Sequence, residues 1–225
     1  FCRYVVVPAA RLLAIPAGLP VRAAALTEPT AIALHTVNLS GVEADDPVLI
    51  TGAGPVGLLT LAVLRARGVE DVTVAEPAPL RQRRAAELGA ARVVVPESLP
   101  PAPMGRPVAD SYAVAFECSG RAAAAVSALD QLDYAGTLVF VGTGHELPRV
   151  NHNRAIVLEL TLLGAYNYDA DGFGSALALL ASGTLPLDLL IEADDVRLDQ
   201  LRTTMDRLAA GELASKVLVR PAASA

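Results

Sequence analysis

The feature that most constrains this fold is a glycine-rich turn directly after an apolar run. Residues 51–57 read Thr-Gly-Ala-Gly-Pro-Val-Gly, which places glycines at 52, 54 and 57 in the spacing G-x-G-x-x-G. Gly52 permits a tight turn, Gly54 lets a diphosphate approach the backbone, and Gly57 lets the following helix pack close to the sheet. The N-terminus of that helix offers free N–H groups and a partial positive charge to phosphate. The motif in this context predicts a dinucleotide-binding strand, turn and helix.

Short β-branched runs alternate with longer alanine- and leucine-rich stretches along most of the chain. This alternation is typical of a parallel sheet covered by helices, and near-continuous apolarity suits strands that are buried on both faces. We therefore predict an α/β fold, a doubly wound parallel sheet of the Rossmann type. The predicted strands are residues 48–51, 72–76, 92–95, 112–117, 137–142 and 158–164. The predicted crossover helices are residues 55–67, 80–88 and 121–132.

The segments outside this alternation are expected to form a loop and two flanking pieces. Four prolines crowd the first half of residues 96–110, so this segment is predicted to be a surface loop. A Tyr-Val-Val-Val strand in residues 1–19 resembles the edge of a β-rich unit, and the C-terminal piece predicts a helix at 198–210 and a strand at 216–219. Because the first residue is Phe, we expect the chain to be the remainder of something longer, with both flanks packed on a missing partner.

An acidic residue stands where a ribose-binding carboxylate is expected. Glu76 closes the second predicted strand about 20 residues after Gly57, the spacing typical of an acid that accepts hydrogen bonds from the adenosine ribose. A carboxylate there repels a 2′-phosphate, which favours NAD over NADP. Arg81, Arg83 and Arg84 follow closely and can pair with a 2′-phosphate, although a solvated helix face also explains them. NAD is the predicted cofactor, and NADP stays an alternative.

Charge and cysteine content narrow the class of protein. Lys and Arg total 18 against 24 Asp and Glu, and the net charge of −6 disfavours nucleic acid as a partner. The uncharged run 47–64 has the length of a membrane helix, but its glycines and proline predict a strand, a turn and a helix instead. Cys2 and Cys118 are too few for a disulfide framework or a four-thiolate zinc site, so a reducing, cytoplasmic setting fits best.

Several ordered motifs together resemble one family. They include the glycine turn, Glu76, the pair Glu28-Pro29 and the tetrapeptide Glu117-Cys-Ser-Gly120. Further matching segments are Ala33-Leu-His35, Arg81, Glu87-Leu-Gly-Ala90, residues 136–142, Leu163-Gly-Ala-Tyr166 and Lys216-Val-Leu-Val. On these residues almost all of the chain resembles the zinc-type medium-chain dehydrogenase/reductases of the alcohol dehydrogenase superfamily, particularly the sorbitol and polyol dehydrogenase branch.

The resemblance implies a domain division and a set of contacts to the cofactor. Residues 1–24 would end a GroES-like β-barrel catalytic domain, 25–194 would form the dinucleotide-binding Rossmann domain, and 195–225 would return to the catalytic domain. The residues implied to hold the adenosine and diphosphate are Gly52, Gly54, Pro55, Val56, Gly57, Glu76 and Arg81, with Ser119 and Gly120 beside the adenine and Val141, Gly142 and Thr143 along the nicotinamide. Glu28 is implied to lie next to a catalytic zinc ion, whereas by itself it reads as a carboxylate at a helix start.

The chain also departs from the family pattern. The Cys and Gly-His-Glu ligands that hold the family's catalytic zinc would precede Phe1, so zinc is expected only if that missing domain is present. A Gly-His-Glu triplet does occur at 144–146, but it follows the fifth strand, and we interpret it as a solvated loop. His35 lies in an apolar helix without a nearby acid and His152 in a polar loop, so core packing and surface exposure are the default interpretations. Asn167 stands where the branch often carries an arginine near the cofactor phosphates.

The implied activity is NAD(P)-dependent hydride transfer between an alcohol or polyol and a nicotinamide, with zinc as the Lewis acid that favours the alkoxide. We predict that this chain supplies the cofactor-binding part, binds NAD(H) and by itself oxidises no alcohol, so no catalytic residue is assigned. Two alternatives stay open: a non-catalytic nucleotide-binding module or degenerate subunit, and a zinc-free reductase of the same superfamily, against which Glu28-Pro29 argues. A homodimer is expected through the apolar edge near 158–168.

Overall fold

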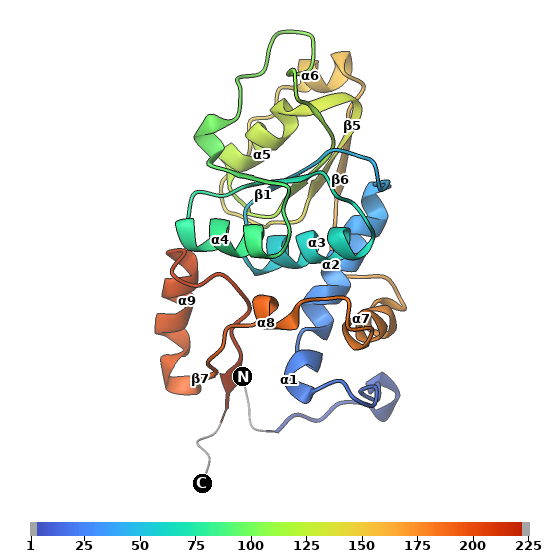
Figure 1. Ribbon diagram of the computed structural model, residues 1–225, viewed down its shortest axis with the longest axis vertical. Helices are drawn as coiled ribbons and strands as arrows, with labels where there is room; N and C mark the ends of the chain where they lie inside the picture. The colour runs from blue at the N-terminus through green and yellow to red at the C-terminus, as the bar shows by residue number, and fades with distance from the viewer. Residues whose placement is uncertain (1–3, 222–225) are drawn as a thin grey trace.

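The computed structural model describes residues 4–221 of the chain. Figure 1 shows a twisted sheet with helices on both of its faces and, at the lower end of the view, a smaller unit that contains both the first and the last described segments. Within the described range no helix is both long and apolar enough to span a lipid bilayer.

The main sheet has six parallel strands in the order β3-β2-β1-β4-β5-β6. Their bounds are β1 Val48–Thr51, β2 Val72–Ala75, β3 Arg92–Val94, β4 Tyr112–Glu117, β5 Leu132–Phe140 and β6 Thr161–Gly164. Thr51 of β1 pairs with Ala75 of β2 on one side and with Glu117 of β4 on the other. The chain order reverses between β1 and β4, and open α/β sheets bind ligands outside the carboxyl ends of the strands at such a switch point. The predicted Rossmann-like fold class is confirmed.

Helices cover both faces of this sheet and define two cores. Their bounds are α1 Val21–Ala24, α2 Thr27–Ser40, α3 Pro55–Ala66, α4 Pro79–Glu87, α5 Ala122–Asp130, α6 His152–Val157, α7 Gly172–Ala181, α8 Leu187–Leu190 and α9 Leu201–Ala209, with single 3-10 turns at η1 Ala9–Arg11, η2 Pro96–Ser98 and η3 Leu198–Gln200. Successive strand side chains point to opposite faces, so Ile50 joins the core with α2 and α3 while Leu49 joins the core with α5. Both side chains are fully buried, as expected of a central strand.

The predicted elements occur in the predicted order, but several of their boundaries are wrong. The strand predicted at 137–142 begins at Leu132 and ends at Phe140. Helix α5 ends at Asp130 rather than at 132, because Leu132 already pairs with Tyr112 as the first residue of β5. The strand predicted at 158–164 begins only at Thr161. Residues 158–160 lie in the turn that follows α6, and α6 is capped where the Asn151 side chain accepts a hydrogen bond from the Arg154 N–H at 3.3 Å. Asn is among the residues preferred at a helix N-cap, and the pattern of apolar residues does not reveal it.

The flanking pieces differ more from expectation. The run at 4–7, predicted to be a strand, forms no regular strand, and Val6 is 100% exposed. A strand forms only where a neighbouring strand pairs with its backbone, which β-branched residues alone do not provide. The C-terminal helix is confirmed as η3 followed by α9. The terminal strand is short, β8 Val219–Arg220, and pairs in parallel with β7 Val196–Arg197.

An ion-pair network joins the two flanks. The Asp195 carboxylate accepts hydrogen bonds from Arg22 at 3.0 Å and from Arg220 at 2.9 Å. The hydrogen bond from Arg220, and then that from Arg22, lower the pKa of Asp195. Segments from opposite ends of the sequence are thereby held together below the sheet (Figure 1).

Candidate dinucleotide-binding site

The three glycines of the turn after β1 have three different geometries. Gly52 has a φ of +95°, and a Cβ atom there would lie 2.8 Å from the Cβ of Ser119. A Cβ atom at Gly57 would lie 2.0 Å from the carbonyl oxygen of Gly52, so helix α3 can start this close to the turn only with glycine. Gly54 is different, because a Cβ atom there would meet only Nη1 of Arg81, at 4.0 Å. The backbone at Gly54 therefore faces open space that a ligand can enter.

Helix α3 begins directly at this open position. Pro55 is its first residue, and no side chain caps its N-terminus. Proline is pre-organised for the first helical position, where its missing N–H is not needed. The N–H groups of Val56 and Gly57 follow in the first turn, where backbone donors have no partner inside the helix. These donors and the helix dipole favour an anion next to Gly54.

Glu76 lies one residue beyond the end of β2 and is 3% exposed. Its Oε2 accepts a hydrogen bond from the Ala53 N–H at 2.7 Å, and its Oε1 accepts one from the Ala78 N–H at 2.9 Å. The carboxylate thus ties the glycine turn to the start of α4. Because a carboxylate offers about four acceptor positions, Glu76 keeps capacity for further donors.

Arg81 reaches from α4 toward the same turn. Its Nε donates to the Leu213 carbonyl oxygen at 3.1 Å and its Nη2 donates to the Leu208 carbonyl oxygen. With Nη1 near Gly54, the guanidinium is held between the turn after α9 and the glycine turn. Arg84, predicted to lie on a solvated face, instead donates to the Leu189 carbonyl oxygen and to Ser215. Of the three arginines, Arg81 and Arg84 are half-buried and Arg83 is exposed.

The turns after β4 and β5 lie against each other. Gly120 has a φ of +68°, and a Cβ atom there would lie 2.3 Å from the Thr143 carbonyl oxygen. A Cβ atom at Gly142 would lie 2.2 Å from the Gly120 nitrogen. The N–H groups of Val141 and Gly142 both donate to the carbonyl oxygen of Glu117, at 2.9 and 2.8 Å. These turns therefore meet backbone to backbone, with no room for side chains between them.

The structure brings together the residues that the sequence nominates for the cofactor. The glycine turn touches Ser119, Arg81 and Glu76, and the turn at Ser119 and Gly120 touches Thr143. All of them lie at the carboxyl edge of β1, β2, β4 and β5. Sequence reasoning assigned no role to the Glu117 side chain, which is 2% exposed at the end of β4; an acid closing an apolar strand is the signal that could have found it.

The residues considered for a metal do not come together. Glu28 lies exposed in the first turn of α2. Across residues 4–221 no three His, Cys, Asp or Glu side chains are grouped closely enough to hold a metal ion. The described residues thus do not fit a catalytic zinc ion, and we derive no step through one.

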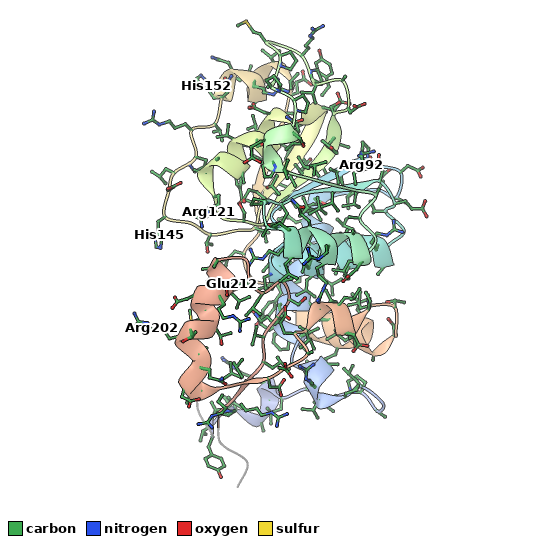
Figure 2. All side chains as sticks on the ribbon, turned by 60° about the vertical axis from the view of Figure 1, so that its left-hand side comes forward. Arg92, Arg121, His145, His152, Arg202 and Glu212 are labelled. Carbon is green, nitrogen blue, oxygen red and sulfur yellow. The ribbon has the colours of Figure 1, made fainter. Side chains whose placement is uncertain are left out.

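Of the three histidines, two are exposed and one lies next to an aspartate. His145, in the loop after β5, and His152, the first residue of α6, are exposed and well separated in Figure 2. His35 has a partner that its own helix does not supply: its Nδ1 lies 2.9 Å from Oδ1 of Asp169. Asn167 has a φ of 56°, a left-handed conformation that Asn tolerates better than most residues.

Cys118 lies beneath the glycine turn. Burial, and to a smaller extent the Glu117 carboxylate, raises the pKa of its thiol to about 12. The thiol is therefore neutral at pH 7 and a poor nucleophile.

Comparisons with known proteins agree with this geometry. A family described as zinc-binding dehydrogenase matches residues 55–182. The (R,R)-butanediol dehydrogenase of Bacillus subtilis (strain 168) is 31% identical over 223 residues, which are 98% of this chain and 64% of that protein. Human sorbitol dehydrogenase is 29% identical over 194 residues, which are 84% of this chain and 54% of that protein. A protein from Sinorhizobium meliloti 1021, with a structure bound to NADP, superposes with a TM-score of 0.82 at 30% identity over 97% of this chain and 65% of that one.

The chain therefore spans between about half and two thirds of the length of these relatives. The family match begins at Pro55, after β1, whereas the butanediol dehydrogenase match covers 98% of the chain. By these matches, together with its fold, the chain belongs to the zinc-binding dehydrogenases, within the zinc-type medium-chain dehydrogenase/reductases that its motifs resemble.

Proposed function

We propose that this chain binds a nicotinamide adenine dinucleotide at the carboxyl edge of its sheet, as part of a protein that transfers a hydride between an alcohol and the nicotinamide. One observation carries the binding proposal. A Cβ atom would lie 2.8 Å from the nearest atom at Gly52 and 2.0 Å at Gly57, whereas at Gly54 between them the nearest atom would be 4.0 Å away. The turn thus leaves room for a ligand only where a diphosphate would approach the first turn of α3.

Each nominated residue has a place in this proposal. The N–H groups of Val56 and Gly57 would donate to the diphosphate, and Pro55 would start the helix there. Arg81 would add its positive charge from the side of α4. The turn at Ser119 and Gly120 would lie beside the adenine, and Val141, Gly142 and Thr143 would line the nicotinamide.

The choice between NAD and NADP is proposed to depend on Glu76. Its buried carboxylate would accept hydrogen bonds from the adenosine ribose and repel a 2′-phosphate. Arg81, the cation closest to Gly54, is already engaged by two carbonyl oxygens, which leaves less of its donor capacity for a 2′-phosphate. We therefore propose NAD as the preferred cofactor, with NADP, which the Sinorhizobium meliloti relative binds, as the competing outcome.

Substrate, assembly and location complete the proposal. The butanediol and sorbitol relatives suggest a small alcohol or polyol as the substrate.

Strand β6 is an edge of the sheet, and Leu162 on it is 38% exposed. Pairing of 158–168 with a second copy would cover this edge. A cytoplasmic setting is proposed because two cysteines are too few for a disulfide framework.

The domain division is also a proposal. Residues 25–194 would be the dinucleotide-binding domain, and 1–24 and 195–225 would belong to the catalytic domain. The network between Arg22, Asp195 and Arg220 supports it, because both flanks contact each other below the sheet.

Calorimetric titration of the 225-residue chain with NADH, compared with Gly54→Val, tests the binding proposal. The new side chain would fill the open space at Gly54, whose φ of −71° and extended ψ suit valine, so the fold should survive while NADH affinity falls by at least about a hundredfold. Ala178→Val on the exposed side of α7 is the matched control and should bind NADH like the wild type. Equal affinity of Gly54→Val and the wild type would refute the proposed site.

The dimer needs a separate measurement. Sedimentation equilibrium should give a dimer for the wild type and a weakened dimer for Leu162→Lys, because a lysine on an edge strand opposes pairing with another strand. Met104→Lys, at a side chain that is 99% exposed in the proline-rich loop, is the control. A wild-type monomer at all concentrations would end the dimer proposal.

A further inference from the structure

The carboxylate of Glu117 is buried beneath the turns that line the proposed cofactor site. Its Oε1 accepts hydrogen bonds from the Ser119 N–H at 2.8 Å, the Gly120 N–H at 3.0 Å and the Ser119 hydroxyl, and its Oε2 accepts a second, longer one from Gly120 at 3.2 Å. The Glu117 side chain is 2% exposed. Its donors all come from one turn, so the carboxylate determines how that turn leaves β4.

The turn at Ser119 and Gly120 packs tightly against the turns after β1 and β5. A Cβ atom at Gly144 would lie 1.9 Å from the Gly120 carbonyl oxygen, and one at Gly52 would lie 2.8 Å from the Cβ of Ser119. The backbone carbonyl of Glu117 also accepts the N–H groups of Val141 and Gly142. A displacement of the turn at 119–120 would therefore displace the turns after β1 and β5.

We propose that Glu117 is a positioning residue for the cofactor: its carboxylate sets the turn at Ser119 and Gly120, and through it holds the glycine turn and the turn at 141–144 in their binding geometry. This inference rests on the proposed function, since it concerns the same site. Glu117 itself touches no part of the cofactor.

The chemistry of the carboxylate explains why a neutral side chain would not replace it. Oε1 receives three donors at once, and hydrogen bonds to an ionised acceptor are about twice as strong as neutral ones. Glutamine keeps one oxygen and presents two N–H donors, which face the N–H groups of Ser119 and Gly120 without an acceptor between them. Aspartate keeps the charge but is shorter by one methylene, so it loses reach to the same donors.

The test measures NADH affinity and thermal stability for the wild type, Glu117→Gln, Glu117→Asp and Asp130→Asn. Asp130 is the control because it is a half-buried acid at the end of α5, where it lies near Arg154 and away from the cofactor turns. We expect Glu117→Gln to raise the NADH Kd about tenfold and Glu117→Asp about threefold, with Asp130→Asn within about twofold of the wild type even where its Tm falls. If Glu117→Gln does not fold, Glu117→Asp carries the test alone.

A double variant separates positioning from general destabilisation. If Glu117 acts through the turn, its effect and that of Ser119→Ala overlap. The NADH Kd of the double variant Glu117→Gln/Ser119→Ala, relative to the wild type, should then rise by less than the product of the fold-changes of the two single variants. Wild-type affinity in both Glu117 variants, multiplicative effects, or an equal loss of affinity in Asp130→Asn would overturn the inference. Failure of the wild type itself to bind NADH would instead refute the proposed function, and the inference with it.

Discussion

Glu76 accepts a hydrogen bond from the backbone N–H of Ala53 at 2.7 Å, across 23 positions in the sequence. This contact joins the end of β2 to the glycine turn after β1. The same carboxylate is therefore both a structural brace and the proposed ribose acceptor. Its two roles can be separated, because only the second depends on which cofactor is offered.

Replacing Glu76 with glutamine should change cofactor preference. We expect Glu76→Gln to raise the NADH Kd about tenfold and to change the NADPH Kd less, because the ribose loses a charged acceptor while the repulsion of a 2′-phosphate disappears. Paired titrations with NADH and NADPH measure this. Glu97→Gln, at an exposed site in η2, should leave both constants unchanged. An unaltered NADH to NADPH ratio in Glu76→Gln would refute the specificity role.

The glycines of the turn should differ sharply in what they tolerate. Gly57→Ala should reduce the free energy of unfolding by about 3 kcal/mol or more, because its Cβ atom would lie 2.0 Å from a backbone oxygen that cannot move alone. Gly54→Ala should leave it within about 1 kcal/mol of the wild type, since the space there is open. Urea denaturation of both variants is the measurement, and similar stabilities would contradict the described turn.

Arg154 should stabilise the proline-rich loop. Its side chain is 4% exposed and donates to the carbonyl oxygens of Pro103 and Arg106 at 3.1 Å and of Asp130 at 2.8 Å. Arg154→Ala leaves these acceptors without their donor, so we expect a loss of about 3 kcal/mol and faster hydrogen exchange in residues 96–110.

Arg202→Ala is the control for this change, because that arginine lies exposed on α9 and points away from the protein in Figure 2. It should alter neither stability nor exchange. Unchanged exchange in the loop of Arg154→Ala would show that other contacts hold it.

The thiol of Cys118 should be unreactive in the folded protein. Burial raises its pKa from 9.0 to about 12, so in a Cys2→Ser background a thiol reagent at pH 8 should label it much more slowly in the folded than in the unfolded chain. The unfolded state loses this proton near pH 9 and the folded state only near pH 12. The stability contributed by the neutral thiol is therefore full below pH 9 and is lost as the pH rises toward 12. Rapid labelling of the folded chain would contradict this.

The sequence was sufficient for the parts of the fold that are set locally. Apolar strand runs and the glycine spacing predicted a doubly wound parallel sheet and the place of Glu76 at the end of its second strand, because a parallel sheet brings the carboxyl ends of its strands to one edge. The prediction of a strand at 4–7 was wrong, because a strand needs a second strand to pair with, and the local sequence does not specify one. The start of β5 at Leu132 was missed for a similar reason, since its pairing with Tyr112 is a tertiary contact.

Contacts between residues far apart in the chain could not be predicted from the sequence. Nothing near His35 indicates Asp169, and nothing near Arg84 indicates Ser215. Glu117 was visible as part of a motif, but its three donors depend on how the turn at Ser119 and Gly120 folds back. Such roles follow from three-dimensional proximity rather than from periodicity or spacing.

The most direct test of the central claim is a crystal structure of the chain grown with NADH. The account predicts the diphosphate next to Gly54, within hydrogen-bonding distance of the Val56 and Gly57 N–H groups, and the adenosine ribose hydroxyls on Glu76. A diphosphate bound elsewhere, or a turn at 52–57 left empty at saturating NADH, would contradict it.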